Sequence, residues 1–256
     1  MEGRVAWVTG GASGLGAQVA KRLAEIGCHI VVNYRTSRKP AEQLAQEIRG
    51  MGREVLAVQG DVSSPEAVRK ISGEIRRRWG RLDVLVCAAG PFLFKRIPTV
   101  EMEDNQWREM VGGNLSGVFY CTREAVPLMQ EQGWGRIITF GFPEVEIAPA
   151  WPGFSAYAAA KAGVVSLTRT MAQETAPYGI TVNMVSPGDI RHPYKEAPIA
   201  AARGKHESKN LVGRPGTGGD LARVIEFLVQ EDSDFITGAV IPVTGGFDNR
   251  QFQVEN

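Results

Sequence analysis

The sequence has few cysteines, almost no net charge and no long apolar run. Its 256 residues contain 3 cysteines, Cys28, Cys87 and Cys121, which are far apart and do not have the spacing of metal ligands. We therefore predict no metal site and no disulfide framework, and expect three buried apolar side chains. The formal net charge is only +1, without a basic stripe that could neutralise nucleic-acid phosphates. We predict no nucleic-acid partner.

Segments for membrane insertion or secretion are also missing from the sequence. No apolar run approaches the roughly 18 residues that a transmembrane helix needs. The N-terminus passes from Met1 straight into the apolar stretch 5–8, without the basic segment, long apolar core and cleavage site of a signal peptide. We expect a cytoplasmic protein with no membrane partner.

Short β-rich segments alternate with amphipathic stretches that suit helices. Strands are predicted at residues 4–9, 30–34, 54–59, 82–87, 136–140, 181–185 and 239–243, and helices at 14–26, 41–51, 65–79, 101–130, 155–176 and 220–229. This alternation predicts an α/β protein with a single-domain Rossmann fold, in which a seven-stranded, doubly wound parallel sheet carries helices on both faces. No linker divides the chain, so one domain is predicted over 1–256.

One long segment, 189–213, shows no clear period. Stretches of this length inside a compact domain are usually functional loops, so we predict a lid over the substrate.

A glycine-rich turn directly follows the first predicted strand and opens the first helix. Its glycines allow a tight turn and close approach of a pyrophosphate, while the helix N-terminus offers N–H groups and partial positive charge. We predict that this turn binds a nucleotide through Gly10, Ser13, Gly14, Leu15 and Gly16.

The glycine spacing is TGxxxGxG, and it is followed in order by several further motifs. These are Asp61-Val62, Cys87-Ala-Ala-Gly90, Asn114, Tyr157-Ala-Ala-Ala-Lys161, Ser186-Pro-Gly188, Arg214-Pro-Gly216 and Val243-Thr-Gly-Gly246. With these motifs the chain resembles the short-chain dehydrogenase/reductase family over nearly its whole length. In overall pattern it is most similar to the 3-oxoacyl-[acyl-carrier-protein] reductases of that family.

The choice of cofactor is predicted from the end of the second strand. NAD enzymes place an acidic residue there, which would repel a 2′-phosphate, but this chain has Tyr34 followed by Arg35. Arg35 can pair with a phosphate, and the hydroxyls of Thr36 and Ser37 can add hydrogen bonds. We therefore predict NADP(H) as the cofactor. The alternative is that Arg35 is simply a surface arginine in a loop that enters a helix.

The resemblance implies further cofactor contacts. Asp61 and Val62 match the pair that meets the adenine ring, and Ala88, Ala89 and Gly90 match a segment whose backbone passes along the cofactor. Pro187, Gly188 and Ile190 match the loop beside the nicotinamide. His192 stands where the family usually has threonine.

Tyr157 and Lys161 are four residues apart in a predicted helix, so they project from the same face. A nearby ammonium lowers the pKa of a phenol and makes it a better acid–base group. The alternative is an ordinary exposed helix face. The resemblance implies that Tyr157 exchanges a proton with the substrate oxygen while the nicotinamide exchanges a hydride. It also implies that Lys161 binds the nicotinamide ribose and that Asn114 holds a water; locally, Asn114 could instead be a helix-kinking amide.

One family residue is missing. The strand at 136–140 should be followed by a serine that donates a hydrogen bond to the substrate oxygen, but Gly141 and Phe142 stand there. Counting back from Tyr157 reaches Glu144 instead, but the intervening loop is two residues longer than usual, so we align Phe142 with the serine. A substrate group, a backbone N–H in 142–144, Ser155 or Thr139 could take over. Phe142 could also select a flat substrate by stacking.

These features predict an NADP(H)-dependent oxidoreductase that acts on a carbonyl or secondary alcohol and resembles a 3-oxoacyl-thioester reductase. An alcohol or sugar-alcohol dehydrogenase is one alternative. A second is a non-catalytic NADP(H)-binding sensor or assembly subunit. The resemblance also implies a homotetramer or homodimer.

Overall fold

The computed structural model describes residues 1–246, so residues 247–256 of the predicted domain lie outside the described part. The strands are β1 (Val5–Thr9), β2 (His29–Tyr34), β3 (Val55–Gln59), β4 (Val84–Cys87), β5 (Gly135–Phe140), β6 (Ile180–Pro187) and β7 (Val240–Val243). The helices are α1 (Gly14–Glu25), α2 (Arg38–Gly50), α3 (Pro65–Trp79), α4 (Asp104–Val111), α5 (Gly117–Gln130), α6 (Ser155–Thr175) and α7 (Gly218–Leu228).

All strands of the described chain form one sheet of seven parallel strands in the order β3-β2-β1-β4-β5-β6-β7. From β1, strands β2 and β3 are added on one side. Strand β4 pairs with the other side of β1, and β5, β6 and β7 follow on that side. This is the predicted doubly wound Rossmann arrangement, which binds ligands where the strand order reverses, outside the carboxyl ends of the strands.

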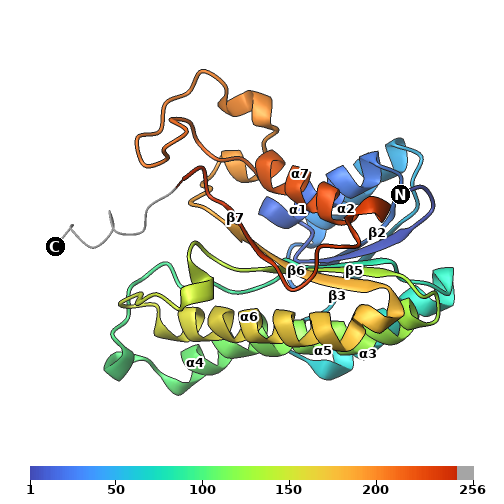
Figure 1. Ribbon diagram of the computed structural model, residues 1–256, viewed down its shortest axis with the longest axis horizontal. Coiled ribbons are helices and arrows are strands. Elements are labelled where there is room, and N and C mark those ends of the chain that lie inside the picture. Colours follow the sequence, from blue (N-terminus) through green and yellow to red (C-terminus); the bar gives the residue numbers. More distant parts are fainter. Residues whose placement is uncertain (247–256) are drawn as a thin grey trace.

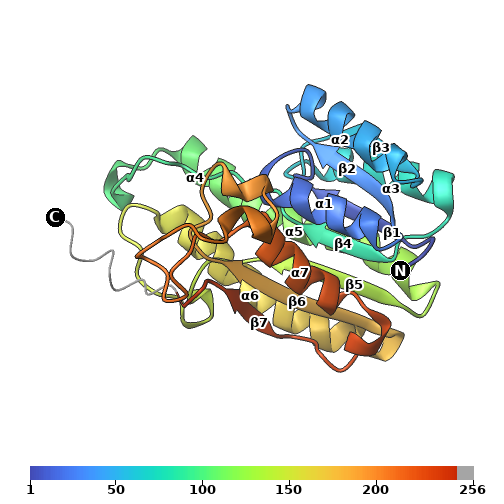
Figure 2. The ribbon, with the colours of Figure 1, turned by 90° about the horizontal axis from the view of Figure 1, so that it is seen from above.

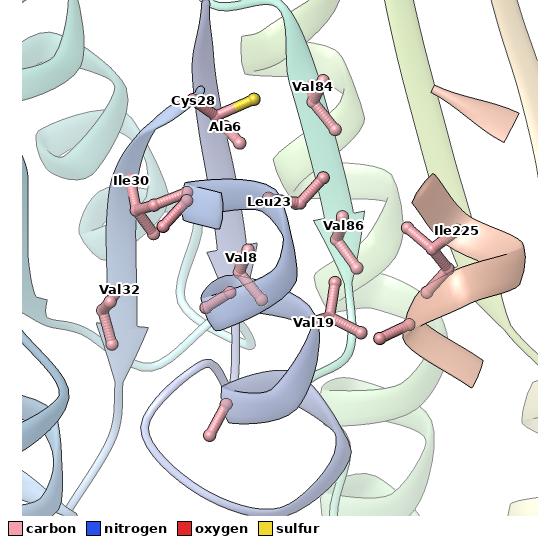
Figure 3. Packing of buried hydrophobic residues seen from close by; sticks show 14 of the residues in the cluster. Ala6, Val8, Val19, Leu23, Cys28, Ile30, Val32, Val84, Val86 and Ile225 are labelled. Atoms are coloured by element: carbon pink, nitrogen blue, oxygen red, sulfur yellow. The ribbon is translucent and has the colours of Figure 1, made fainter. Parts of the chain in front are cut away.

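Helices cover both faces of the sheet, as predicted. Helices α1, α2 and α7 lie on one face, and α3, α5 and α6 lie on the other (Figures 1 and 2). Figure 3 shows Val19 and Leu23 of α1 packed over Val8 and Val86 in the sheet, with Ile225 of α7 beside them. All five side chains are fully or almost fully buried, so the hydrophobic effect fixes α1 and its N-terminal glycine turn on the sheet.

The prediction of one continuous helix over 101–130 was wrong in two respects: the helix begins later, and it is interrupted. Helix α4 begins at Asp104, after a hydrogen bond from the backbone N–H of Glu103 to the Gln106 side chain. A π-helical segment, Gly112–Ser116, then separates α4 from α5. A Cβ atom on Gly113 would lie 2.3 Å from Cδ of Pro91, so the glycine lets the loop after β4 approach the helix closely.

The aperiodic segment 189–213 contains two short 3-10 turns, Tyr194–Glu196 and Ile199–Ala202. In Figure 1 it is the orange loop that projects beyond α7. The three cysteines are buried and unpaired, as predicted. Within residues 1–246, the helices are too short or too polar to cross a membrane.

Candidate active site

Tyr157 and Lys161 lie in the first turns of α6, and the structure brings them together as predicted. Nζ of Lys161 lies 5.7 Å from the centroid of the Tyr157 ring. The Lys161 side chain is almost completely buried, which is unusual for a lysine and marks it as a candidate for function. The spacing of four residues on one helix is enough to produce this contact.

Burial shifts the pKa of each group in the direction that favours its neutral form. The pKa of Lys161 falls to about 8, and the pKa of Tyr157 rises to about 12. The direction for Tyr157 is opposite to the lowering predicted from the sequence, because burial penalises the charged phenolate. Tyr157 is protonated at neutral pH and can donate a proton.

Asn114 lies in the π-helical segment and is completely buried. Its Nδ2 donates hydrogen bonds to the carbonyls of Pro91 at 2.8 Å and Met110 at 3.0 Å. Its Oδ1 has no partner among the described residues, and a Cβ atom on Gly90 would lie 2.2 Å from it. The amide is thus held in one orientation, with a free acceptor toward the loop after β4.

The glycine turn between β1 and α1 has the geometry that the sequence predicted. Gly10 and Gly14 adopt φ of +62° and +61°, a left-handed conformation that favours glycine. A Cβ atom on Gly16 would lie 2.4 Å from the carbonyl oxygen of Gly10, so this position also requires glycine. Ser13 precedes α1 without making a side-chain capping hydrogen bond, and Leu15, in the first turn of α1, is half-buried.

A distant carboxylate occupies this helix N-terminus. Oε1 of Glu196 accepts a hydrogen bond from the backbone N–H of Gly14 at 2.5 Å. Glu196 belongs to the 3-10 turn Tyr194–Glu196 inside the predicted lid. The turn packs directly against the start of α7. This close approach requires glycine at position 218, because a Cβ atom there would lie 2.0 Å from the carbonyl oxygen of Lys195. The N-terminus of α1 therefore accepts an anionic oxygen, which is what a phosphate site requires.

The loop after β4 lies against the glycine turn. The Thr9 hydroxyl accepts a hydrogen bond from the backbone N–H of Ala89 at 3.0 Å. A Cβ atom on Gly10 would lie 2.9 Å from Cα of Ala89. Ala88 and Ala89 of the predicted segment thus lie directly beside the turn.

Arg35 follows β2 and points toward two carboxylates. Its guanidinium lies 3.7 Å from Asp61 and 3.6 Å from Glu109, and 54% of its side chain is exposed. Tyr34 is buried, and the Ser37 hydroxyl makes no capping hydrogen bond to α2. The remaining residues predicted here, Thr36 and Val62, lie in the loops after β2 and β3.

The loop after β6 contains the residues that were matched to the nicotinamide site. Ile190 is buried, and a Cβ atom on Gly188 would lie 2.9 Å from Cα of Thr244. Pro187 ends β6, and the loop after it lines a cavity of about 230 Å³ with Gly188, Asp189 and Ile190, together with Asn210 and Val212 of the predicted lid.

The sequence motifs did not reveal an aromatic cluster around Tyr157. We call it the aromatic wall; it consists of Phe92, Phe94, Phe142, Trp151 and Phe154. The Tyr157 ring lies 4.9 Å from the ring of Phe92, 5.8 Å from Trp151 and 6.1 Å from Phe142, measured between centroids. The one sequence signal for this cluster is that its residues follow β4 and β5, because ligands of this fold bind outside the carboxyl ends of the strands.

Comparisons with known proteins identify relatives of this chain. A family model described as enoyl-(acyl carrier protein) reductase matches residues 10–248. The Bacillus subtilis protein YtkK, provisionally named an oxidoreductase, is 42% identical over 96% of both chains. A Bacillus thuringiensis structure, provisionally named a 3-oxoacyl-reductase, has a TM-score of 0.89 and 43% identity, covering 96% of this chain and 98% of the other.

A variant of a Serratia marcescens short-chain dehydrogenase/reductase has a TM-score of 0.84 and 32% identity, and covers 96% of this chain and 98% of its own. The chain belongs to the short-chain dehydrogenase/reductase family. This family consists of oxidoreductases that act on alcohols and carbonyls with nicotinamide cofactors.

The groups that were considered as substitutes for a serine in this short-chain dehydrogenase/reductase differ in availability. The hydroxyl of Thr139 is buried and hydrogen-bonded to the hydroxyl of Thr168 at 2.8 Å, so it is already engaged. The buried hydroxyl of Ser155 has no partner among the described residues. Phe142 is buried beside Trp151, with 4.9 Å between the ring centroids. The side chain at position 142 therefore offers no hydrogen-bond donor.

Proposed function

We propose that this short-chain dehydrogenase/reductase transfers a hydride between NADP(H) and a carbonyl or secondary-alcohol substrate, with Tyr157 exchanging the proton. The observation that carries the proposal is the contact between the buried ammonium of Lys161 and the ring of Tyr157. The provisional name of the Bacillus thuringiensis structure supports a 3-oxoacyl-type substrate. An alcohol or sugar-alcohol dehydrogenase is the alternative reaction at the same site.

The residues at the carboxyl edge of the sheet fit the proposed cofactor. The N-terminus of α1 already holds one anionic oxygen, that of Glu196, so it suits the pyrophosphate. Arg35 would pair with the 2′-phosphate, and Asp61 and Ile190 would lie near the adenine and the nicotinamide. The bound nicotinamide supplies or takes up the hydride.

Tyr157 and Lys161 have different roles in the proposed proton transfer. Because the pKa of Tyr157 is about 12, the hydroxyl keeps its proton until a negative charge develops on the substrate oxygen. Lys161, with a pKa of about 8, is mostly protonated at neutral pH and stabilises the phenolate that remains after donation. Asn114 would hold the water that passes a new proton to Lys161.

We further propose that Phe142 replaces the serine that usually polarises the substrate carbonyl. Loss of one such donor typically lowers turnover by 10²–10³, or about 2.7–4 kcal/mol. Among the alternatives considered, Ser155 keeps a hydroxyl without a partner in the described chain, whereas Thr139 is engaged with Thr168. A substrate with an activated carbonyl would need less help from either group.

Substitution of Tyr157 by phenylalanine tests the proposed function. We expect Tyr157→Phe to reduce NADPH-dependent carbonyl reduction by at least about 10²-fold, since general acid catalysis contributes 10²–10⁴. Tyr178→Phe is the matched control, because Tyr178 is 47% exposed and lies in the turn after α6. Unchanged turnover in Tyr157→Phe would refute the role of Tyr157. Tight NADPH binding without turnover of any carbonyl would favour a non-catalytic sensor or assembly subunit.

We also propose a homotetramer or homodimer in which α4, α5 and α6 meet a second copy. Trp107 on α4 and Phe119 on α5 are both 44% exposed, which leaves apolar surface for a partner. Sedimentation at micromolar concentration tests this, and a monomer would reject it. A cytoplasmic location remains a prediction from the sequence.

A further inference from the structure

We propose that the substrate is a planar ketone conjugated to a ring, and that the aromatic wall selects it. This inference rests on the proposed hydride transfer at Tyr157, and it favours a ring-bearing ketone over the 3-oxoacyl-type substrate that the name of the Bacillus thuringiensis structure suggests. It is carried by the number and arrangement of ring side chains around a single hydroxyl.

The aromatic wall comes from two loops that are tied together. Phe92 and Phe94 follow β4, whereas Phe142, Trp151 and Phe154 follow β5. The backbone N–H of Ile97 donates a hydrogen bond to the carbonyl of Gly153 at 3.0 Å. A Cβ atom on Gly153 would lie 2.8 Å from Cβ of Arg96, so the two loops touch. They form one continuous surface beside Tyr157.

The rings of the wall present both edges and faces. Phe92 meets Tyr157 edge to face at 87°, whereas Phe92 and Phe154 are nearly parallel at 12° with 5.3 Å between their centroids. Phe92, Trp151 and Phe154 are only partly buried, and Phe94 is 85% exposed. Ring surface that is not consumed by the core is therefore available to a ligand. Aromatic pairs gain stabilisation beyond simple area burial, which an aliphatic ligand cannot reproduce.

The chemistry of the site points to the same substrate class. Phe142 provides no hydrogen bond to polarise a carbonyl, so a simple aliphatic ketone would react slowly. A second carbonyl next to the reacting one withdraws electron density, which makes the carbonyl carbon more electrophilic and stabilises the alkoxide that forms. Such a substrate depends less on the missing donor. Phe142 thus removes a polar contact, whereas the partly buried rings of Phe92, Trp151 and Phe154 offer flat contacts.

The proposed reduction balances with the groups already assigned. The reduced nicotinamide provides a hydride, which carries two electrons and forms the new C–H bond at the carbonyl carbon. The C=O π bond breaks, and its electron pair takes the hydroxyl proton of Tyr157 to form the O–H bond. The products are a secondary alcohol and the oxidised nicotinamide. Solvent returns one proton to Tyr157.

Two α-diketones that differ in one group, phenylpropanedione and hexanedione, test the inference by direct binding. Isothermal titration calorimetry with the full chain should give a Kd at least about 10-fold lower for phenylpropanedione, since aromatic contacts add about 0.5–1.5 kcal/mol per pair. Because binding is measured without turnover, the result does not depend on the hydride-transfer step.

The variants Phe92→Leu and Trp151→Leu keep apolar volume but remove a ring. Each should raise the Kd of phenylpropanedione by about 3- to 10-fold and change that of hexanedione less than about twofold. Phe235→Leu is the matched control, because Phe235 is fully exposed and lies outside the wall. Far-ultraviolet circular dichroism identifies a variant that fails to fold, in which case the other variant decides.

Equal affinity of the parent chain for both diketones would overturn the inference. A folded Phe92→Leu or Trp151→Leu variant that raises the Kd of both diketones by the same factor would also overturn it. Neither result affects the Tyr157→Phe test, so the substrate class can fail while the proposed hydride transfer stands. Conversely, selective binding of phenylpropanedione by a chain whose turnover ignores Tyr157 would refute the mechanism alone.

Discussion

The carboxylate of Glu196 accepts a hydrogen bond from the backbone N–H of Gly14, with 2.5 Å between Oε1 and N. The two residues are 182 positions apart, and the contact joins the predicted lid to the N-terminus of α1. If the cofactor pyrophosphate binds at this helix end, as proposed, it must displace the carboxylate.

We expect Glu196→Gln to bind NADPH more tightly than the parent chain. Removing the negative charge weakens the competing contact, and a charge at a helix N-terminus contributes about 0.3–1 kcal/mol, so the Kd should fall about two- to fivefold. Fluorescence titration measures this. Glu207→Gln in the same segment is the control, because the Glu207 carboxylate binds the nearby backbone N–H of Lys209. Equal Kd values for Glu196→Gln and the parent would show that the contact does not oppose the cofactor.

The depressed pKa of Lys161 makes stability depend on pH. The pKa is about 8 in the folded chain and 10.5 ordinarily, so between these values the unfolded chain binds a proton that the folded chain has released. Stability therefore gains from Lys161 as pH rises through this window, and the full cost of burying the charge applies below about pH 8.

Lys161→Met should consequently stabilise the fold by on the order of 2 kcal/mol near pH 7, and the gain should shrink toward pH 10. Urea unfolding at about pH 7 and about pH 9.5 provides the comparison. Lys70→Met, which changes an exposed lysine on α3, should show no such trend. A constant difference between Lys161→Met and the parent across this range would contradict the assigned pKa shift.

Cofactor preference should depend on Arg35. Loss of charge-assisted hydrogen bonds to a 2′-phosphate costs about 1.5–3 kcal/mol, so Arg35→Ala should weaken NADPH binding by at least about 10-fold. Affinity for NADH should change little, because Arg35 has no 2′-phosphate to meet there. Arg49→Ala, at the exposed far end of α2, is the control. Equal losses for both cofactors, or a parent chain that prefers NADH, would disprove the NADP(H) assignment.

Close packing between Gly90 and Asn114 should make Gly90→Ala costly. The new Cβ atom would lie 2.2 Å from Oδ1 of Asn114, whose amide is held by two backbone carbonyls. We expect a loss of about 1–3 kcal/mol in stability together with lower turnover. Gly73→Ala, on α3 with open space around the new atom, should instead stabilise by about 0.5–1 kcal/mol. A Gly90→Ala variant as stable as the parent would mean that Asn114 moves freely.

Most of the fold was predictable because its signals are local. Valine- and isoleucine-rich strands alternate with amphipathic helices, and the spacing of Tyr157 and Lys161 on one helix is sufficient to bring them together. Helix α4 was misjudged because residues 101–103 continue an amphipathic pattern, although the Glu103–Gln106 contact starts the helix later.

Other features depend on tertiary structure and leave no periodic trace. The contact between Glu196 and Gly14 joins distant segments, and the aromatic wall is assembled from two irregular loops. The direction of the Tyr157 pKa shift follows from its degree of burial, which the spacing of two residues does not report.

The hydrogen bond between Ile97 and Gly153 links the two loops of the aromatic wall, so a change in one loop affects the position of the other. The loops lie outside the packed strands, so descendants of this gene could exchange their ring side chains without losing the fold. A large change in one loop would disturb its partner, however. We therefore expect positions 92–97 and 151–154 to vary together among close homologues, and new substrate ranges to arise in evolution by paired changes there.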